Sequence, residues 1–75
     1  MGITMPINHQ PVGSSNISSV GYDSSTQTLE VQFTSGSRYQ YFDVPEEDYD
    51  SFMASPSKGE FFASQIKGVY QYSRN

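Results

Sequence analysis

Two tyrosines separated by a single residue, Tyr39 and Tyr41, are the first candidates for a binding function. Successive residues of a strand point to opposite faces, so these two rings would share one face. Aromatic rings on a sheet can stack nucleic-acid bases, which contributes roughly 1–3 kcal/mol per base. Alternatively, both rings belong to the core, with their hydroxyl groups reaching polar partners at its edge. The face on which the pair lies separates these two interpretations.

A second candidate is the segment Ser57-Lys58-Gly59, which begins a predicted helix. A helix N-terminus offers free N–H groups and the positive end of the helix dipole, and a glycine lets an anion approach closely. The alternative is an ordinary capping box, in which Ser57 reaches forward and Glu60 reaches back. We favour the capping box, and the segment also lacks the upstream glycine and trailing Lys-Ser/Thr of a Walker phosphate loop.

Charged residues are few and unevenly placed. Of 75 residues, four are basic and eight are acidic, which gives a net charge of −4 with the single histidine neutral. Five of the acids lie between Asp43 and Asp50. Carboxylates can serve acid–base chemistry or bind a divalent cation, but no calcium-loop pattern is present and a solvated helix face explains them better. Because that surface would repel nucleic acid, we expect any phosphate contact elsewhere, at Arg38, Lys58, Lys67 or Arg74.

The composition argues against an enzyme and against bound metals or cofactors. The chain contains no cysteine, which rules out disulfides and Cys-rich zinc sites. The single histidine, His9, lies in a segment without hydrophobic periodicity, and the serines are predicted loop or cap residues without a base nearby in the sequence. We therefore expect no catalytic residue, no metal site and no cofactor.

The length allows one small domain. Residues 1–13 include two prolines and no sustained hydrophobic period, so they predict a flexible N-terminal tail, with residues 14–75 forming the single domain. No stretch reaches the roughly 18 apolar residues of a membrane span, and the N-terminus lacks the basic and apolar parts of a secretion signal. We therefore expect a cytoplasmic protein without membrane contact.

Three strands should position the tyrosine pair. Residues 17–22 are the first strand candidate, and the strict alternation of apolar and polar side chains over residues 29–33 predicts the second. Turn residues follow, and residues 38–42 return as the third strand. The alternation over 29–33 is typical of a strand with one buried face.

The turn between the second and third strands sets which side chains share a face. If Gly36 takes the left-handed position of a three-residue loop, Val31 faces Tyr39 and Leu29 faces Tyr41. A four-residue loop would instead mix polar and apolar side chains on both faces. The first register is therefore favoured, and it places both tyrosines on the buried face. The opposite face then carries Glu30, Gln32, Arg38 and Gln40.

Two helices are expected after the strands. Pro45 suits the first helical position, where a missing N–H costs nothing, and Pro56 ends that helix. The second helix begins at Ser57. The resulting fold class is α+β, a three-stranded antiparallel β-meander with two C-terminal helices packed on one face. Its predicted core comprises Val20, Tyr22, Leu29, Val31, Phe33, Tyr39, Tyr41, Tyr49, Phe52, Met53, Phe62 and Ile66.

A longer ordered pattern extends from Ser14 to Tyr70. It consists of Ser14-Ser15-Asn16-Ile17, Val20-Gly21-Tyr22-Asp23, Leu29-x-Val31-x-Phe33-x-x-Gly36, Tyr39-x-Tyr41, Val44-Pro45, Tyr49, Phe52, Ser57-x-Gly59-x-Phe61-Phe62 and Ile66-Lys67-x-x-Tyr70. This ordered set resembles the KTSC domain, a small module found at the C-terminus of some lysyl-tRNA synthetases and as free-standing bacterial proteins. The resemblance implies a suggested RNA-binding role and no enzymatic activity.

We therefore expect a small non-enzymatic binding module whose partner is RNA, an expectation that rests mainly on the resemblance. The candidate contacts to nucleic acid or another anion are Arg38, Tyr39, Tyr41, Ser57, Lys58, Gly59 and Lys67. The net negative charge opposes this function, because nucleic-acid binders usually carry a concentrated basic face. The alternative is a protein–protein interaction module that uses an edge strand or exposed aromatics such as Phe42, Phe61 or Tyr72. The sequence leaves the oligomeric state open.

Overall fold

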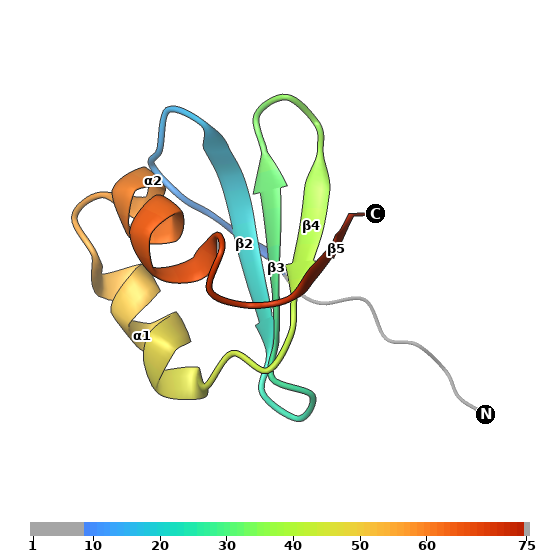
Figure 1. Ribbon diagram of the computed structural model, residues 1–75. Coiled ribbons are helices and arrows are strands. Elements are labelled where there is room, and N and C mark those ends of the chain that lie inside the picture. The colour runs from blue at the N-terminus through green and yellow to red at the C-terminus, as the bar shows by residue number, and fades with distance from the viewer. Residues whose placement is uncertain (1–8, 75) are drawn as a thin grey trace.

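The computed structural model describes residues 9–74, which form one antiparallel sheet with the helical segments against one of its faces (Figure 1). The strands are β1 (His9–Pro11), β2 (Ile17–Asp23), β3 (Thr28–Phe33), β4 (Arg38–Tyr41) and β5 (Tyr72–Arg74), and they are neighbours in chain order. Between β4 and β5 lie α1 (Glu46–Ala54), α2 (Lys58–Phe61) and the π-helical segment η1 (Phe62–Ile66). Within residues 9–74, no helix is long and apolar enough to cross a membrane.

The predicted α+β class is confirmed, and the predicted meander corresponds to β2, β3 and β4. The predicted number of strands is wrong, because the sheet has five. The two additional strands lie at the sheet edges and contain three residues each, which is too short for hydrophobic periodicity to reveal. His9–Pro11, predicted as tail, pairs with β2 as an edge strand. Residues 1–8 of the predicted tail lie outside the described residues.

The hairpin between β3 and β4 has the predicted register. Leu29 lies opposite Tyr41, and Val31 lies opposite Tyr39. Gly36 has a φ of +99°, which a glycine adopts without steric cost. Its N–H donates to the Phe33 carbonyl at 2.9 Å, and the Phe33 N–H donates to the Ser37 carbonyl at 2.8 Å. The loop is therefore the three-residue type with a glycine bulge, and both tyrosines lie on the face toward the helices.

Both helices begin close to their predicted starts, with local differences. Pro45 precedes α1 as its cap residue, in an extended conformation, and is not its first helical residue. At α2, Ser57 Oγ accepts a hydrogen bond from the Glu60 N–H at 3.4 Å, which is the forward half of the predicted capping box. The Ser57 N–H donates to Ser55 Oγ at 3.2 Å, where the sequence predicts the Glu60 side chain as acceptor.

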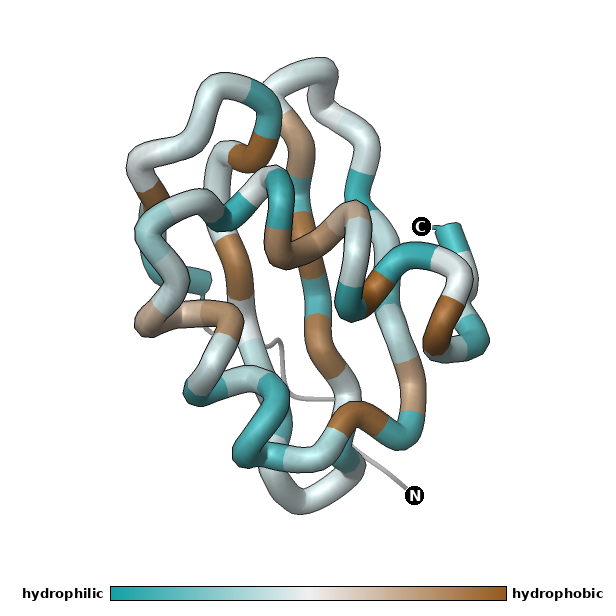
Figure 2. The backbone as a smooth tube through the Cα atoms, turned by 60° about the vertical axis from the view of Figure 1, so that its left-hand side comes forward, coloured by the Kyte–Doolittle hydropathy of each residue, from teal (hydrophilic) through white to brown (hydrophobic). Residues whose placement is uncertain are grey.

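Buried side chains from the sheet and the helices form one core cluster. Every predicted core residue is either fully buried or packed against the buried cluster. The structure adds Ile17 and Val44, which are completely buried. Figure 2 shows hydrophobic and hydrophilic positions alternating along the central strand, as expected for a sheet with one face toward the core. The buried cluster comprises Ile17, Val20, Leu29, Val31, Tyr41, Val44, Phe52, Phe62 and Ile66.

Candidate functional site

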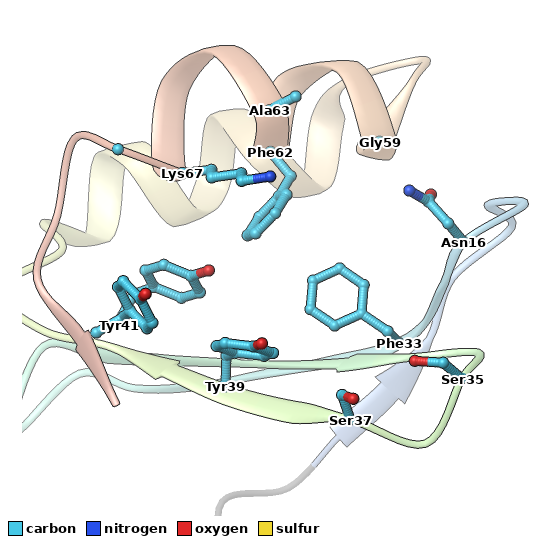
Figure 3. A pocket seen from close by; sticks show the side chains of 12 residues that line it. Asn16, Phe33, Ser35, Ser37, Tyr39, Tyr41, Gly59, Phe62, Ala63 and Lys67 are labelled. Atoms are coloured by element: carbon cyan, nitrogen blue, oxygen red, sulfur yellow. The ribbon is translucent and has the colours of Figure 1, made fainter. Parts of the chain in front are cut away.

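A cleft of about 420 Å³ lies between the sheet and the α2–η1 segment (Figure 3). Aromatic rings of β3 and β4 form its floor, and the helical segment with the residues directly after it forms its roof. Asn16 and Ser35 lie at one end in Figure 3, with Tyr41 toward the other. The lining residues are Asn16, Phe33, Ser35, Ser37, Tyr39, Tyr41, Gly59, Phe62, Ala63, Lys67, Gly68 and Tyr72.

The aromatic rings of the cleft divide into buried and accessible ones. Tyr41 and Phe62 are only 4% and 6% exposed, and their rings meet edge to face with centroids 5.4 Å apart. Tyr72 is 60% exposed, and its ring centroid lies 5.6 Å from that of the half-buried Tyr39. Tyr41 therefore belongs to the core, whereas Tyr39 and Tyr72 offer ring surface to a ligand.

The buried tyrosine hydroxyl adds no negative charge to the cleft. Burial raises the pKa of Tyr41 to about 12, with smaller contributions from the neighbouring Tyr39 and Tyr72. Its phenol is consequently neutral at physiological pH. Of the described residues that line the cleft, none is acidic. An anionic ligand would therefore meet no negatively charged side chain among the described lining residues.

One cation lines the cleft and a second lies beside it. Lys67 lines it, and Figure 3 shows its side chain extending beside Phe62. Arg74 lies beside the floor, because its Nη2 donates to Ser37 Oγ at 3.1 Å and its guanidinium lies 5.8 Å from the centre of the Tyr39 ring. That distance permits a cation–π contact. The cleft thus combines aromatic surface with positive charge in a chain whose net charge is −4.

The π-helical segment determines where Lys67 lies. The Lys67 N–H donates to the Phe62 carbonyl, five residues back, at 2.8 Å, and the backbone then leaves the helix. Gly68 follows with a φ of +80°, a conformation typical of the residue that ends a helix. The sequence pattern Phe62, Ile66, Val69 indicates ordinary helical spacing and gives no signal for the π-turn. Such turns occur frequently at functional sites.

The predicted anion site at the start of α2 does not form as a unit. Lys58 Nζ donates to the Ser55 carbonyl at 2.8 Å, so it stabilises the end of α1. The Ser57 hydroxyl oxygen accepts the capping hydrogen bond. Only Gly59 of the three lines the cleft, where a Cβ atom would lie 3.1 Å from Asn16 Oδ1. The capping interpretation therefore explains Ser57 and Lys58, and Gly59 belongs to the cleft through its lack of a side chain.

Arg38 is separated from the other candidate residues. Its β4 neighbours Tyr39 and Gln40 alternate between faces, and Arg38 lies on the face away from the helices. Its Nη2 donates to Gln32 Oε1 at 2.6 Å, and its Nη1 lies 3.9 Å from Glu30 Oε1. Of the seven candidate residues, the cleft therefore brings together Tyr39, Tyr41, Gly59 and Lys67.

The sequence missed a polar cluster on the face away from the helices. Glu30, predicted on a polar outer face, is only 4% exposed. His9 Nε2 lies 2.5 Å from Glu30 Oε1, His9 Nδ1 lies 2.7 Å from Ser19 Oγ, and Gln40 donates to Glu30 Oε2 at 3.0 Å. A chain of serine, histidine and carboxylate occurs in hydrolases, but none of these four residues lines the cleft. We interpret the cluster as the attachment of β1 to the sheet.

No metal site is evident in the part of the chain that the structure describes. Residues 9–74 contain no group of three or more His, Cys, Asp or Glu side chains arranged to hold an ion. The run of acids between Asp43 and Asp50 falls mainly in α1, with Glu46, Glu47 and Asp48 in its first turn. Acids at that position interact favourably with the helix dipole.

Comparison with known proteins assigns most of the chain to one family. A family model described as the KTSC domain matches residues 13–72. A protein of Tsukamurella paurometabola is 43% identical over 58 residues, which cover 77% of this chain and 87% of that protein. The lysine–tRNA ligase of Trichormus variabilis is 45% identical over 53 residues, which cover 71% of this chain and only 9% of the ligase. The crystal structure of a KTSC domain protein from Yersinia pestis has a TM-score of 0.90 and 43% identity, covering 93% of this chain and 99% of that one.

Proposed function

Because this chain belongs to the KTSC domain family, we propose that it is a small, non-enzymatic, cytoplasmic binding module that holds RNA in the cleft beneath α2 and η1. The observation that carries the proposal is the composition of the cleft. Accessible tyrosine rings and Lys67 line it, Arg74 lies beside Tyr39, and none of its described lining residues is acidic. Stacking on the rings and neutralisation of phosphate are the two interactions on which binding of single strands depends.

The distribution of charge supports the cleft as the side that meets RNA. The first turn of α1 carries three acids, Glu46, Glu47 and Asp48, and none of them lines the cleft. Like charges on that helix would repel a phosphate backbone, whereas Lys67 and Arg74 would attract it. The negative net charge then favours one orientation of the nucleic acid, although it weakens binding as a whole.

Two further observations support binding to RNA without catalysis. One relative is a ligase named for its tRNA substrate, and part of it is 45% identical to this chain. The described residues that line the cleft include neither a histidine nor a carboxylate, which are the common general acids and bases. A ligand in the cleft would therefore be held by stacking, hydrogen bonds and charge.

The test is a fluorescence anisotropy titration of labelled single-stranded RNA with the variants Tyr72→Ala and Val69→Ala. Both side chains are about equally exposed, at 60% and 61%, but only Tyr72 lines the cleft. We expect Tyr72→Ala to weaken binding about fivefold or more, the loss expected for one stacking ring. Val69→Ala should leave the affinity unchanged. No binding at low salt, or equal losses in both variants, would refute RNA binding in the cleft.

A second function is favoured by one observation on the same edge of the sheet. Val69 and Tyr72 are the most exposed large hydrophobic side chains among residues 9–74, and all three residues of β5 are exposed. A protein partner could add a strand beside β5 and cover these side chains. The other predicted contact aromatics, Phe42 and Phe61, are half-buried, so this edge is the candidate interface. A protein partner whose binding is lost with Val69→Ala would support this second function.

A further inference from the structure

We infer that the cleft is built for a single nucleotide unit, a base with one phosphate, rather than for a run of stacked bases. The inference rests on the proposed function and adds the size and polarity of the ligand. The shared chemistry is that of a nucleoside monophosphate, which is available either as a free nucleotide or as one unit of an RNA strand.

The size of the cleft and the positions of its rings limit it to one base. About 420 Å³ lies toward the small end of the roughly 300–1,000 Å³ typical of small-molecule pockets. Phe62 stands between Phe33 and Tyr41, with ring centroids 5.3 Å and 5.4 Å away and interplanar angles of 72° and 78°. These edge-to-face contacts occupy the Phe62 ring, so its surface is not available to a ligand. With Tyr41 and Phe62 buried, the accessible ring surface is that of Tyr72 and of the half-buried Tyr39 and Phe33, which a cleft of this volume offers to one base.

The phosphate is expected at Lys67 and Arg74. Arg74 is held in place by Ser37 and by the Tyr39 ring, so its guanidinium is already ordered beside the stacking surface. Lys67 is exposed and its side chain makes no hydrogen bond or ion pair with the described residues, so its ammonium group is available to a ligand. Two cations beside one stacking surface suit a single phosphate attached to the stacked base.

Asn16 supplies a hydrogen-bond donor at the end of the cleft away from Tyr41. The backbone N–H groups of Asn16 and Ile17 donate to Ser14 Oγ at 3.4 Å and 3.3 Å, so the Ser14 hydroxyl hydrogen is left to donate to Asn16 Oδ1 at 3.0 Å. This pattern assigns the two ends of the amide. It leaves the amide nitrogen toward the cleft, as Figure 3 shows. Asn16 is therefore positioned to donate to a base edge or a ribose oxygen.

The test is an NMR titration of the ¹⁵N-labelled chain with adenosine 5′-monophosphate, adenosine and inorganic phosphate. We expect saturable shifts at Ser37, Lys67 and Gly68 with the nucleotide, and at least about tenfold weaker binding of adenosine, the loss expected for one charge-assisted contact. Lys67→Ala should lower the nucleotide affinity toward that of adenosine, because only Arg74 then contacts the phosphate, while Arg38→Ala on the opposite face should leave it unchanged. Asn16→Ala should weaken the nucleotide and adenosine alike and leave inorganic phosphate unaffected.

Binding of short RNA strands distinguishes a free nucleotide from one unit of an RNA strand as the ligand. It also distinguishes failure of the one-nucleotide inference from failure of the proposed function. Equal affinity for a dinucleotide and a hexanucleotide, corrected for the number of equivalent positions, would support the one-nucleotide site. A strand that binds in the cleft while the mononucleotide does not, or an affinity that keeps rising with length, would overturn this inference and leave the proposed function standing. If neither mononucleotide nor strand binds, the proposed function itself fails. Adenosine that binds as tightly as its monophosphate would overturn the phosphate assignment.

Discussion

Glu30 is a carboxylate in the middle of an antiparallel sheet, on the face away from the helices, and it is almost fully buried. Burying a charge without partners is expensive, so hydrogen bonds must replace the lost water. His9 and Gln40 contribute two of those bonds from the strands β1 and β4. The alternation of side chains correctly predicts the face on which Glu30 lies. The burial of Glu30 depends on β1, which hydrophobic periodicity does not predict.

At the residue scale, we expect His9→Ala to destabilise the fold by about 1–3 kcal/mol, because a buried carboxylate loses one hydrogen-bond partner. Arg38→Ala is the control, since its guanidinium is exposed and lies 3.9 Å from Glu30 Oε1. That substitution should cost no more than about 1 kcal/mol, as is usual for surface ion pairs. Urea denaturation of both variants measures the difference. Equal losses would show that His9 does not support Glu30.

At the element scale, the β3–β4 hairpin was predictable because several local signals agree. The alternation from Leu29 to Phe33 marks the strand, and only the three-residue loop with Gly36 in the left-handed position keeps the polar and apolar faces apart. The helix starts were predictable from proline and serine for the same reason. The edge strands β1 and β5 were not predictable, because three residues are too few to show a hydrophobic period. The π-turn before Lys67 was not predictable either, because the spacing of its hydrophobic residues resembles that of a regular helix.

The cleft was predictable only in part. Tyr39, Tyr41, Gly59 and Lys67 were candidate residues, and the structure brings all four to the cleft. The sequence indicates Tyr72 only as an exposed aromatic and Arg74 only as one of four possible phosphate contacts, without placing either beside Tyr39. Their contribution depends on β5 returning to pair with β4, a contact between residues more than 30 positions apart. Lys58 and Arg38 carry the same charge as Lys67, but tertiary packing directs them elsewhere.

A prediction at this scale concerns the turn that follows the π-helix. Gly68 has a φ of +80° with no atom near its absent Cβ, so Gly68→Ala adds backbone strain without a steric clash. We expect a loss of about 1–2 kcal/mol in the free energy of unfolding. Gly13→Ala is the matched control, because Gly13 also has open space but no positive φ. Thermal unfolding of both variants measures the effect, and a Gly68→Ala variant as stable as Gly13→Ala would contradict it.

At the scale of the whole molecule, tyrosine ionisation links stability to alkaline pH. Burial raises the pKa of Tyr41 to about 12, and a hydrogen bond from the Tyr70 hydroxyl to Asp48, together with burial, raises the pKa of Tyr70 to about 12. In the unfolded chain both titrate near their ordinary value of about 10. Their contribution to stability is therefore complete below about pH 10 and is lost as pH rises toward 12, because the unfolded state releases its protons first.

We therefore expect the midpoint of urea unfolding to fall steadily between pH 10 and 12. Circular dichroism measures the unfolding at each pH. Tyr70→Phe removes one of the two groups, so it should lower the midpoint below pH 9, where the hydrogen bond to Asp48 is intact, and make the fall at higher pH shallower. An unfolding midpoint that stays constant up to pH 12 would contradict the role of these two phenols in stability.

We propose that RNA binding depends on the charge at the cleft and not on the net charge of the molecule. Charge reversal at two positions tests it most directly, because Lys67→Glu and Arg38→Glu change the net charge equally but lie on opposite faces of the sheet. We measure the affinity for labelled single-stranded RNA over a range of salt. For the one phosphate that Lys67 and Arg74 would share, the wild type should show a slope of about −0.7 in log affinity against log salt. Lys67→Glu should abolish measurable binding or at least halve that slope, and Arg38→Glu should leave both affinity and slope close to wild type. Equal losses in the two variants, or a loss confined to Arg38→Glu, would contradict the claim.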